Sequence, residues 1–440
     1  MLNIKDDSRK VEKGDTFVAL KKVNDGHDYI IDAINKGANK VVVEKGLYDV
    51  ETIVVNDTHK YLVDYLKENY YDKIKKLKLI AMTGTNGKTT TCFLIYQALN
   101  KANIKCAYIG TIGFYIEDKI KDLNNTTPDI LEMYELLLEC VKRGVEYVVM
   151  EASSQALDMH RLDGLEFEYG IFSNITQDHL DYHLTMENYI KCKQKLFDNV
   201  KNKTFVNIDD EYSNYFIREN SVTYGINKSD YQLSDFTIDL SGSRFKVNDT
   251  SYKTSLIGKH NLYNILAVIA LLGELDIANI EQIVESLIAP KGRMDVIRKG
   301  DNLIIVDYAH TPDAVSKIIS AVKELKPNRI ITIIGCGGNR DKTKRPIMSK
   351  IACENSDYVI LTSDNPRCED PKKIIDDMLQ NLDNKNYEID VNREKAIIKG
   401  IQSLTKNDIL LVLGKGHETY QIIGNTKYDF DDKKIILSNI

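Results

Sequence analysis

The sequence lacks long apolar runs, CxxC pairs and an excess of positive charge, and each absence excludes a class of protein. No stretch approaches the run of about 18 apolar residues that spans a bilayer, and the N-terminus has no signal-peptide core. The seven cysteines, an odd number, fit reduced thiols better than a disulfide framework or a cysteine zinc site. The formal net charge of -6 argues against non-specific nucleic-acid binding. We therefore expect a cytoplasmic monomer with small-molecule substrates and with neither nucleic acid nor membrane as a partner.

The length of 440 residues indicates about three domains, because it exceeds what one ordinary core supports. We expect strands and one helix in residues 1–77, with the charged stretch 71–78 as a linker. Strands then alternate with helices over 78–291, apart from an antiparallel insert at 221–255, and again over 292–440. This alternation is typical of an α/β fold with mostly parallel sheets.

The most informative segment is an apolar strand at 79–83 that leads into Gly84-Thr-Asn-Gly-Lys-Thr89 and then into an amphipathic helix. Backbone N–H groups and a helix N-terminus would converge there and bind phosphates. Lys88 would supply a charge for the terminal phosphates, and Thr89 a hydroxyl for magnesium. The standard spacing requires glycine at Met82, so the loop is a shortened variant. An ordinary glycine turn is the alternative, and we interpret the segment as an ATP site.

Polar side chains follow several apolar strands at the point where each strand should end. Such loops begin at Glu151, Ser173, Gly335, Thr362 and Gly414. Ligands of open parallel sheets bind at the carboxyl ends of their strands. Two sheets, each with one such edge, would allow two substrates to be joined at a site between two domains.

Magnesium beside a triphosphate requires oxygen ligands, which Thr89 and Glu151 could supply. His179, close to Asp178, Asp181 and His183, could complete the coordination shell. Alternatively, Glu151 is a strand-end cap and His179 an ordinary loop histidine.

A helical-wheel projection of residues 189–197 places Lys193 on an apolar face. Tyr189, Ile190, Leu196 and Phe197 belong to that face, whereas Lys191 and Lys195 point away from it. Lys193 therefore either extends to the rim of the core or has a specific partner there.

Asp364-Asn-Pro-Arg367 combines a rigid turn with carboxylate, amide and guanidinium groups. Together they could bind a zwitterion, because arginine pairs with a carboxylate and aspartate accepts from an ammonium. Arg340 and Glu418, in neighbouring strand-end loops, offer a second guanidinium and a second carboxylate. The alternative is an Asn-Pro turn with an incidental surface arginine.

These motifs resemble the Mur ligases, the ATP-dependent amino-acid ligases of peptidoglycan precursor synthesis, over nearly the whole chain. The resemblance implies a small N-terminal α/β UDP-binding domain, a central P-loop ATPase-like domain with a parallel sheet, and a Rossmann-like C-terminal domain. It also implies ATP and Mg²⁺ as cofactors. Lys88, His179 and Lys193 would be catalytic, with Lys193 carbamylated. Metal ligands would be Thr89, Glu151, His179 and Lys193.

The resemblance further implies two sets of binding residues. Nucleotide contacts would come from Gly84, Thr85, Asn86, Gly87, Lys88, Thr89, Thr90, Asn261, Asn264, Arg293, Asp307 and His310. Substrate contacts would come from Ser8, Thr126, Thr127, Ser153, Arg161, Arg340, Asp364, Asn365, Pro366, Arg367, Gly414 and Glu418.

The 364–367 turn resembles the version that selects meso-diaminopimelate, which would be joined to UDP-N-acetylmuramoyl-L-alanyl-D-glutamate. Lysine-adding relatives usually lack this arginine, and diaminopimelate carries a second carboxylate that lysine does not. Three alternatives remain: a lysine-adding ligase, a folylpolyglutamate synthase-like or polyglutamate-forming ligase, and a non-catalytic paralogue that binds nucleotide or UDP-sugar. Gln155 and Met159, which depart from the family pattern, leave room for the last.

Overall fold

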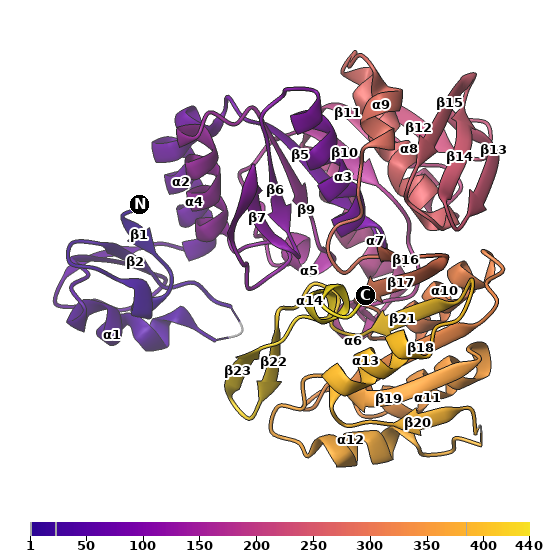
Figure 1. The fold of residues 1–440 in the computed structure, drawn as a ribbon. Helices are drawn as coiled ribbons and strands as arrows, with labels where there is room; N and C mark the ends of the chain where they lie inside the picture. Colours follow the sequence, from indigo (N-terminus) through magenta and orange to yellow (C-terminus); the bar gives the residue numbers. More distant parts are fainter. Residues whose placement is uncertain (1, 23, 384) are drawn as a thin grey trace. The chain divides into compact units, whose positions relative to one another are not determined.

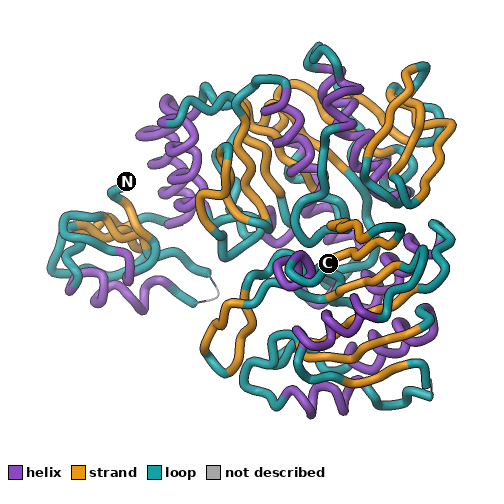
Figure 2. Tube along the Cα trace, viewed as in Figure 1, coloured by secondary structure: helices purple, strands orange, loops and turns teal. Residues whose placement is uncertain are grey.

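The computed structural model describes residues 2–22, 24–383 and 385–440, and it divides the chain into two compact units, 1–224 and 225–440. Figure 2 shows helices and strands alternating through most of the chain. The α/β class expected from the sequence is confirmed. The three domains proposed from the sequence stay a prediction.

Unit 1 begins with a small parallel sheet in the order β1-β2-β3-β4. Helix α1 (Ile30–Asn35) precedes β3, and the long helix α2 (Thr58–Ile74) follows β4 (Figure 1). Leu2, Ile4, Val18 and Val42 share one buried cluster with Leu62 and Leu66 of α2, so this helix anchors the sheet. The strands are β1 (Ile4–Lys5), β2 (Thr16–Val18), β3 (Lys40–Val43) and β4 (Glu51–Val54).

The second sheet of unit 1 has the strand order β12-β11-β10-β5-β9-β6-β7-β8. Strands β12 to β6 in this order pair in parallel, whereas β7 and β8 are antiparallel. The carboxyl ends of β10, β5 and β9 therefore lie at one edge. The strands are β5 (Lys78–Thr83), β6 (Cys106–Gly110), β7 (Gly113–Ile116), β8 (Asp118–Lys121), β9 (Tyr147–Glu151), β10 (Phe167–Phe172), β11 (Val200–Asn207) and β12 (Ser221–Gly225).

Helices cover both faces of this sheet. Alternate residues of each strand point to opposite faces, and apolar residues on both faces need a packing partner. Helix α4 (Ile130–Lys142) shares a buried cluster with Leu79, Ala81 and Val148. Helix α3 (Lys88–Lys101) also contacts β5, β6 and β9, yet none of its residues belongs to that cluster. The two helices therefore cover opposite faces. The shorter helices are α5 (Ser154–Asp158), α6 (Leu180–His183) and α7 (Met186–Gln194).

Unit 2 contains an antiparallel ribbon, β13 (Tyr231–Asp239), β14 (Gly242–Val247) and β15 (Thr250–Thr254), and then helices α8 (Lys259–Glu274) and α9 (Ile280–Glu285). A second sheet follows in the order β16-β17-β21-β18-β19-β20, parallel except for β16. Its strands are β16 (Asp295–Lys299), β17 (Asn302–Asp307), β18 (Ile330–Cys336), β19 (Tyr358–Ser363), β20 (Tyr387–Ile389) and β21 (Ile409–Leu413).

Both faces of this second sheet are buried. Residues such as Ile305 and Leu411 pack with α10 (Pro312–Lys323), α11 (Lys344–Asn355) and α12 (Pro371–Met378). Their neighbours Ile304 and Leu410 pack on the other side with α13 (Arg393–Gln402) and α14 (Asp432–Leu437). A hairpin, β22 (Tyr420–Ile423) with β23 (Thr426–Asp429), follows β21.

Three expectations were wrong in detail. Residues 1–77 were expected to hold one helix, and they contain both α1 and α2. Residues 71–74 are not a linker, because α2 continues to Ile74 and buries Leu62, Leu66 and Ile74 on one face. Residues 221–225 do not belong to an antiparallel insert, because β12 pairs in parallel with β11. The antiparallel part begins only at Tyr231. Among the described residues, no helix is both long enough and apolar enough to cross a membrane.

Candidate functional site

The glycine loop, residues 83–88, joins β5 to α3 with the backbone shape expected for an anion site. Gly87 caps α3 with φ +89°, a conformation that favours glycine. A Cβ on Gly84 would lie 1.9 Å from the Ser173 hydroxyl, so any side chain there would clash with the loop that follows β10. The first turn of α3 buries Thr89 and Thr90. The free N–H groups and the positive end of the dipole of α3 therefore lie at the glycine loop, where they can bind an anion.

A second strand-end loop, residues 173–176, fixes the glycine loop. The Thr85 amide donates to the Asn174 carbonyl at 2.7 Å, and the Asn86 amide donates to the Asn174 side-chain oxygen at 3.0 Å. The Ser173 hydroxyl donates to the Asn86 carbonyl at 2.7 Å. Because β10 and β5 are adjacent and parallel, these two loops meet at the carboxyl edge of the sheet.

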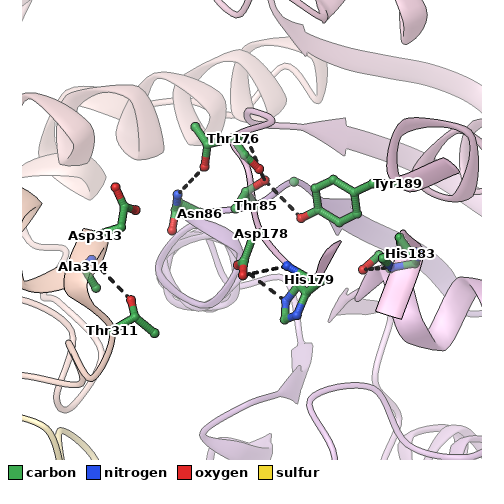
Figure 3. A network of polar contacts seen from close by, with 12 residues as sticks. Thr85, Asn86, Thr176, Asp178, His179, His183, Tyr189, Thr311, Asp313 and Ala314 are labelled. Carbon is green, nitrogen blue, oxygen red and sulfur yellow. Dashed lines mark hydrogen bonds and ion pairs between the residues drawn. The ribbon is translucent and has the colours of Figure 1, made fainter. Parts of the chain in front are cut away.

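Tyr189 of α7 connects the glycine loop to His179. Figure 3 shows the Tyr189 hydroxyl directed at Thr85, with 3.1 Å between the two hydroxyl oxygens. The His179 ring lies 6.3 Å from the Tyr189 ring, centroid to centroid. His179 has φ +52° and a half-exposed side chain beside Asp178. It therefore lies near the glycine loop, and its role as a metal ligand stays a prediction.

Two lysines converge on one oxygen of the glycine loop. The ammonium groups of Lys88 and Lys193 each donate to the Gly84 carbonyl at 2.8 Å. Lys193 is 1% exposed, which confirms the inward orientation expected from its helical position. Burial, reinforced by the charge of Lys88, lowers the pKa of Lys193 well below its ordinary value. A buried lysine of this kind is a candidate for a neutral, reactive amine.

Glu151, at the end of β9, is 1% exposed and accepts hydrogen bonds on both oxygens. Thr89 Oγ1 donates to Glu151 Oε2 at 2.9 Å, and Thr111 Oγ1 donates to the same oxygen at 3.1 Å. Tyr108 and the Thr111 amide donate to Glu151 Oε1 at 2.5 and 2.8 Å. The hydroxyl and the carboxylate expected to bind magnesium are thus together, and both are hard oxygen donors.

Four of the residues expected to bind substrate, Thr126, Thr127, Ser153 and Arg161, lie beside Glu151 or are linked to it through hydrogen bonds. The Thr127 hydroxyl donates to the Glu151 carbonyl at 2.7 Å and accepts from the Ser153 amide at 3.1 Å. Arg161 donates to the Thr127 carbonyl at 2.9 Å and pairs with Asp129. Thr126 lies 3.1 Å from Thr111, hydroxyl to hydroxyl. Ser8, which was also expected to bind substrate, is buried near the first sheet. Among the described residues, no hydrogen bond or ion pair joins it to this group.

In unit 2 the 364–367 turn follows β19, next to the loops after β18 and β21. The Asn365 amide group donates to Glu418 Oε2 at 2.7 Å. Asp364 and Asn365 are buried, and a Cβ on Gly414 would lie 2.6 Å from an Asp364 carboxylate oxygen. The structure therefore brings the 364–367 turn, Gly414 and Glu418 together, as the sequence predicted.

Two arginines expected to bind a carboxylate lie close to Gly337, near the position that a Cβ on this residue would occupy. A Cβ on Gly337 would be 3.0 Å from an Arg367 guanidinium nitrogen and 3.7 Å from Arg340 Cγ. Arg367 donates to the Gly338 carbonyl at 2.9 Å and has φ +51°. Arg340 is exposed. Two cations beside one backbone segment suit a carboxylate ligand.

Lys415 is a residue of this group that the sequence did not single out. It is fully buried, and its ammonium donates to Asn365 Oδ1 and to Glu418 Oε2 at 3.1 Å each. The one sequence feature that could have indicated its role is its position between two glycines at the end of an apolar strand. It holds the two polar side chains of the pocket in one arrangement.

The other residues expected at the nucleotide lie in two places in unit 2. Asn264 donates to Asn261 at 3.0 Å in the first turns of α8. The Arg293 guanidinium lies 4.9 Å above the Tyr308 ring, beside Asp307, whose pKa burial raises. His310 contacts the Tyr308 carbonyl at 2.8 Å, and burial lowers the pKa of its imidazole. Their contact with a nucleotide stays a prediction.

Two family models match the chain. One describes the Mur ligase middle domain and matches residues 82–272, and the other describes the glutamate ligase domain of Mur ligases and matches residues 292–416. These ranges hold the glycine loop and the 364–367 turn, respectively.

Curated relatives match nearly the whole chain. Two UDP-N-acetylmuramoyl-L-alanyl-D-glutamate–2,6-diaminopimelate ligases are each 43% identical to it, from Clostridium perfringens (99% of this chain and 94% of the relative) and Fusobacterium nucleatum (98% and 92%). A solved structure of a ligase with the same name is 34% identical over 99% of this chain and 94% of its own, with a TM-score of 0.72. A MurF ligase from Thermotoga maritima, solved with ADP, is 20% identical over 94% of this chain and 93% of its own (TM-score 0.65), which shows the shared fold alone.

Proposed function

Because the chain belongs to the Mur ligase family, we propose that it joins meso-diaminopimelate to UDP-N-acetylmuramoyl-L-alanyl-D-glutamate at the expense of ATP. The D-glutamate side-chain carboxylate attacks the γ-phosphorus, which gives an acyl phosphate and ADP. The amine of the amino acid then attacks the acyl carbon, and phosphate leaves as the amide forms. The reaction consumes ATP, so we infer a cytoplasmic location.

The observation that carries this proposal is the Thr89–Glu151 hydrogen bond of 2.9 Å at the N-terminus of α3, next to Lys88. Phosphoryl transfer depends mainly on positioning and on charge stabilisation. The backbone N–H groups of the glycine loop would bind the phosphates, and the Lys88 ammonium would stabilise charge that develops on the transferred group. Residues 173–176 support this geometry, because they hold the glycine loop by several hydrogen bonds, including those from the Thr85 and Asn86 amides and from the Ser173 hydroxyl.

The donor atoms around Glu151 fit a magnesium ion, because a buried carboxylate and a threonine hydroxyl are the oxygen ligands that Mg²⁺ prefers. Thr89 and Glu151 would hold it, with His179 and a carbamylated Lys193 as further ligands. When bound, magnesium neutralises phosphate charge. Tyr108 and Thr111 orient the Glu151 carboxylate through their hydrogen bonds.

Carbamylation of Lys193 is chemically consistent with its surroundings. The lone pair of a neutral Nζ attacks carbon dioxide, and one amine proton leaves to solvent, so that a carbamate anion replaces the amine. This requires an unprotonated lysine, and burial together with Lys88 lowers the pKa of Lys193. The buried ammonium position beside the Gly84 carbonyl supports Lys193 as the modified residue.

The second carboxylate of diaminopimelate gives a reason for two arginines. Arg367 and Arg340 both lie close to Gly337, and each could pair with a carboxylate. Glu418 and Asp364 would accept from ammonium groups of the ligand. Lysine would leave at least one guanidinium without a charged partner, which disfavours it.

The experiment is phosphate release by the purified chain with ATP, Mg²⁺ and the UDP-muramoyl-dipeptide, supplied with meso-diaminopimelate, L-lysine or L-glutamate in parallel, with product masses measured. We expect release and a new amide product only with diaminopimelate. Equal turnover with lysine would instead establish a lysine-adding ligase. A further mixture replaces the UDP-muramoyl-dipeptide with a folate, and turnover there with L-glutamate would establish a folylpolyglutamate synthase-like enzyme. Nucleotide binding without release in any mixture would identify a non-catalytic paralogue.

A further inference from the structure

A second group of metal-ligating side chains lies in unit 1, and none of its members is among the residues proposed to bind magnesium or the phosphates. His59, His160 and Asp163 offer one donor atom each, and these atoms all lie within 4.8 Å of one another. His59 comes from the first turn of α2, whereas His160 and Asp163 come from the loop between α5 and β10. Residues 101 positions apart in the sequence therefore meet at one point.

The spacing of the three donor atoms suits a transition-metal ion. Asp163 Oδ2 lies 3.3 Å from His59 Nε2 and 2.9 Å from His160 Nδ1. Ligands at about 2.0–2.1 Å from a tetrahedral zinc ion are about 3.4 Å apart. The two imidazole rings are 5.5 Å apart, centroid to centroid, and tilted by 54°, so they do not stack. Small movements of exposed side chains would complete the geometry.

The chemistry of the donors favours zinc over magnesium. Two imidazoles with one carboxylate form a set that zinc and related metals bind, whereas magnesium prefers oxygen ligands. An aspartate carboxylate has an ordinary pKa of about 3.9, so Asp163 can offer its ionised form, the form that binds a metal, at neutral pH.

The loop that carries two of the donors is held close to the helix that carries the third. A Cβ on Gly164 would lie 3.1 Å from Val63 of α2 and 3.3 Å from Lys67 Cε. His160 has φ +57°, in the left-handed region that few side chains adopt, and this conformation directs it to Asp163. The simpler interpretation is a hydrogen-bonded His-Asp-His cluster without a metal. It would account for the two short contacts, and it predicts no uptake of zinc.

We propose that His59 Nε2, His160 Nδ1 and Asp163 form a zinc-binding site, with water as the remaining ligand, that ties α2 to the loop between α5 and β10. This loop also carries Arg161, which donates to the Thr127 carbonyl and pairs with Asp129. A metal there would therefore hold the segment next to Arg161 in one position. The site does not depend on the proposed reaction.

The test uses the full chain with Cys368→Ser, which removes an exposed thiol that could bind metal. After chelator treatment, the protein is titrated with Zn²⁺ in buffer that contains Mg²⁺, and binding is followed by calorimetry and by Tm. We expect one equivalent of zinc and a Tm rise of about 5 °C at saturation. His59→Gln, His160→Gln and Asp163→Asn should each lower the affinity at least about tenfold.

The matched control is His27→Gln, because His27 also contacts an aspartate but uses its other ring nitrogen to accept from the Glu44 amide. This variant should bind zinc as the parent does. ¹⁵N-histidine NMR of the parent provides a measurement that no variant can confound. Zinc should shift His59 Nε2 and His160 Nδ1. The proposal is wrong if neither nitrogen responds, or if zinc uptake survives all three substitutions.

Discussion

Lys88 and Lys193 donate to the same carbonyl oxygen, that of Gly84, at 2.8 Å each, although they come from different helices. Two ammonium groups this close disfavour their joint protonation. Lys193 is the more deeply buried of the two, so it is the group that loses its proton more readily. A neutral amine at this position is what carbamylation requires.

Incubation with ¹³C-labelled carbon dioxide should therefore give one carbamate carbon signal by NMR, and this signal should disappear in Lys193→Met. The signal should grow as pH rises through the lowered pKa of Lys193, because only the neutral amine reacts. Lys191→Ala is the matched control, since Lys191 is exposed on the same helix and pairs with Glu187. A carbamate signal that persists in Lys193→Met would assign the modification to another amine.

Replacement of Lys88 by alanine should lower the rate of phosphate release by at least about 10²-fold, because a positioned charge at the transferred group is lost. The Tm should change little, since the Gly84 and Thr85 carbonyls that accept from Lys88 lie in a glycine loop that Ser173 and Asn174 also hold. Lys101→Ala, at the exposed last residue of α3, should retain the parent rate. Parent-like turnover in Lys88→Ala would remove the glycine loop from the mechanism.

Arg367→Ala should raise the Michaelis constant for diaminopimelate about 10- to 100-fold, the loss of a charge-assisted hydrogen bond worth about 1.5–3 kcal/mol. The constant for ATP should stay within about twofold. Steady-state kinetics with each substrate varied in turn measures both. Lys372→Ala, an exposed cation in the first turn of α12, should change neither constant. Equal effects of Arg367→Ala on both substrates would contradict a role in amino-acid selection.

Lys415→Met should lower stability by about 3 kcal/mol, because Glu418 and Asn365 lose the buried cation that they share. Thermal unfolding should show this as a Tm several degrees lower. The Michaelis constant for the amino acid should rise while that for ATP does not. Adding Glu418→Gln to Lys415→Met should recover part of the Tm but none of the amino-acid affinity. Full recovery of both would show that Lys415 has a packing role alone.

Glu369 should make unit 2 sensitive to acid. Hydrogen bonds from Arg345 lower the pKa of Glu369 from 4.5 to about 2. Between these pH values the unfolded chain binds more protons than the folded one, so stability present above pH 4.5 is lost as pH falls towards 2. Glu369→Gln should therefore be less stable than the parent at pH 7 by about 1 kcal/mol, and this difference should be smaller at pH 3 and close only as pH approaches 2. Urea unfolding at both pH values tests this, and Glu394→Gln, exposed on α13, should behave as the parent throughout.

The sequence was sufficient for features with a local or periodic cause. The glycine loop and α3 follow from a strand, two glycines and an amphipathic run, and Lys193 points inward because three-residue and four-residue spacings put it on an apolar face. The 364–367 turn and Glu418 meet because they follow β19 and β21, the two parallel strands that pair with β18 on either side. Each of these needed only a pattern and a rule of sheet topology.

Other features depend on contacts between distant residues, which periodicity does not report. Lys415 looked like part of a glycine-rich loop, and only the fold places its ammonium between Asn365 and Glu418. The whole of helix α2 was missed, because its surface is charged and its buried residues are few, and its last turn resembles a linker. His59 gave no signal either, since its neighbours His160 and Asp163 are about a hundred positions away.

The peptide groups of Arg367 are part of the strand-like pairing with the β22–β23 hairpin. Its amide donates to the Ile422 carbonyl at 3.0 Å, and its own carbonyl accepts from Gly424 at 2.7 Å. The backbone of Arg367 is thereby fixed to the hairpin. Lengthening or shortening the turn at Gly424 and Asn425 would therefore move the guanidinium charge and leave the side chains of the pocket unchanged. Under the proposed role of Arg367, an insertion or a deletion outside the pocket would change the choice of amino acid, a route open to evolution and to protein engineering alike.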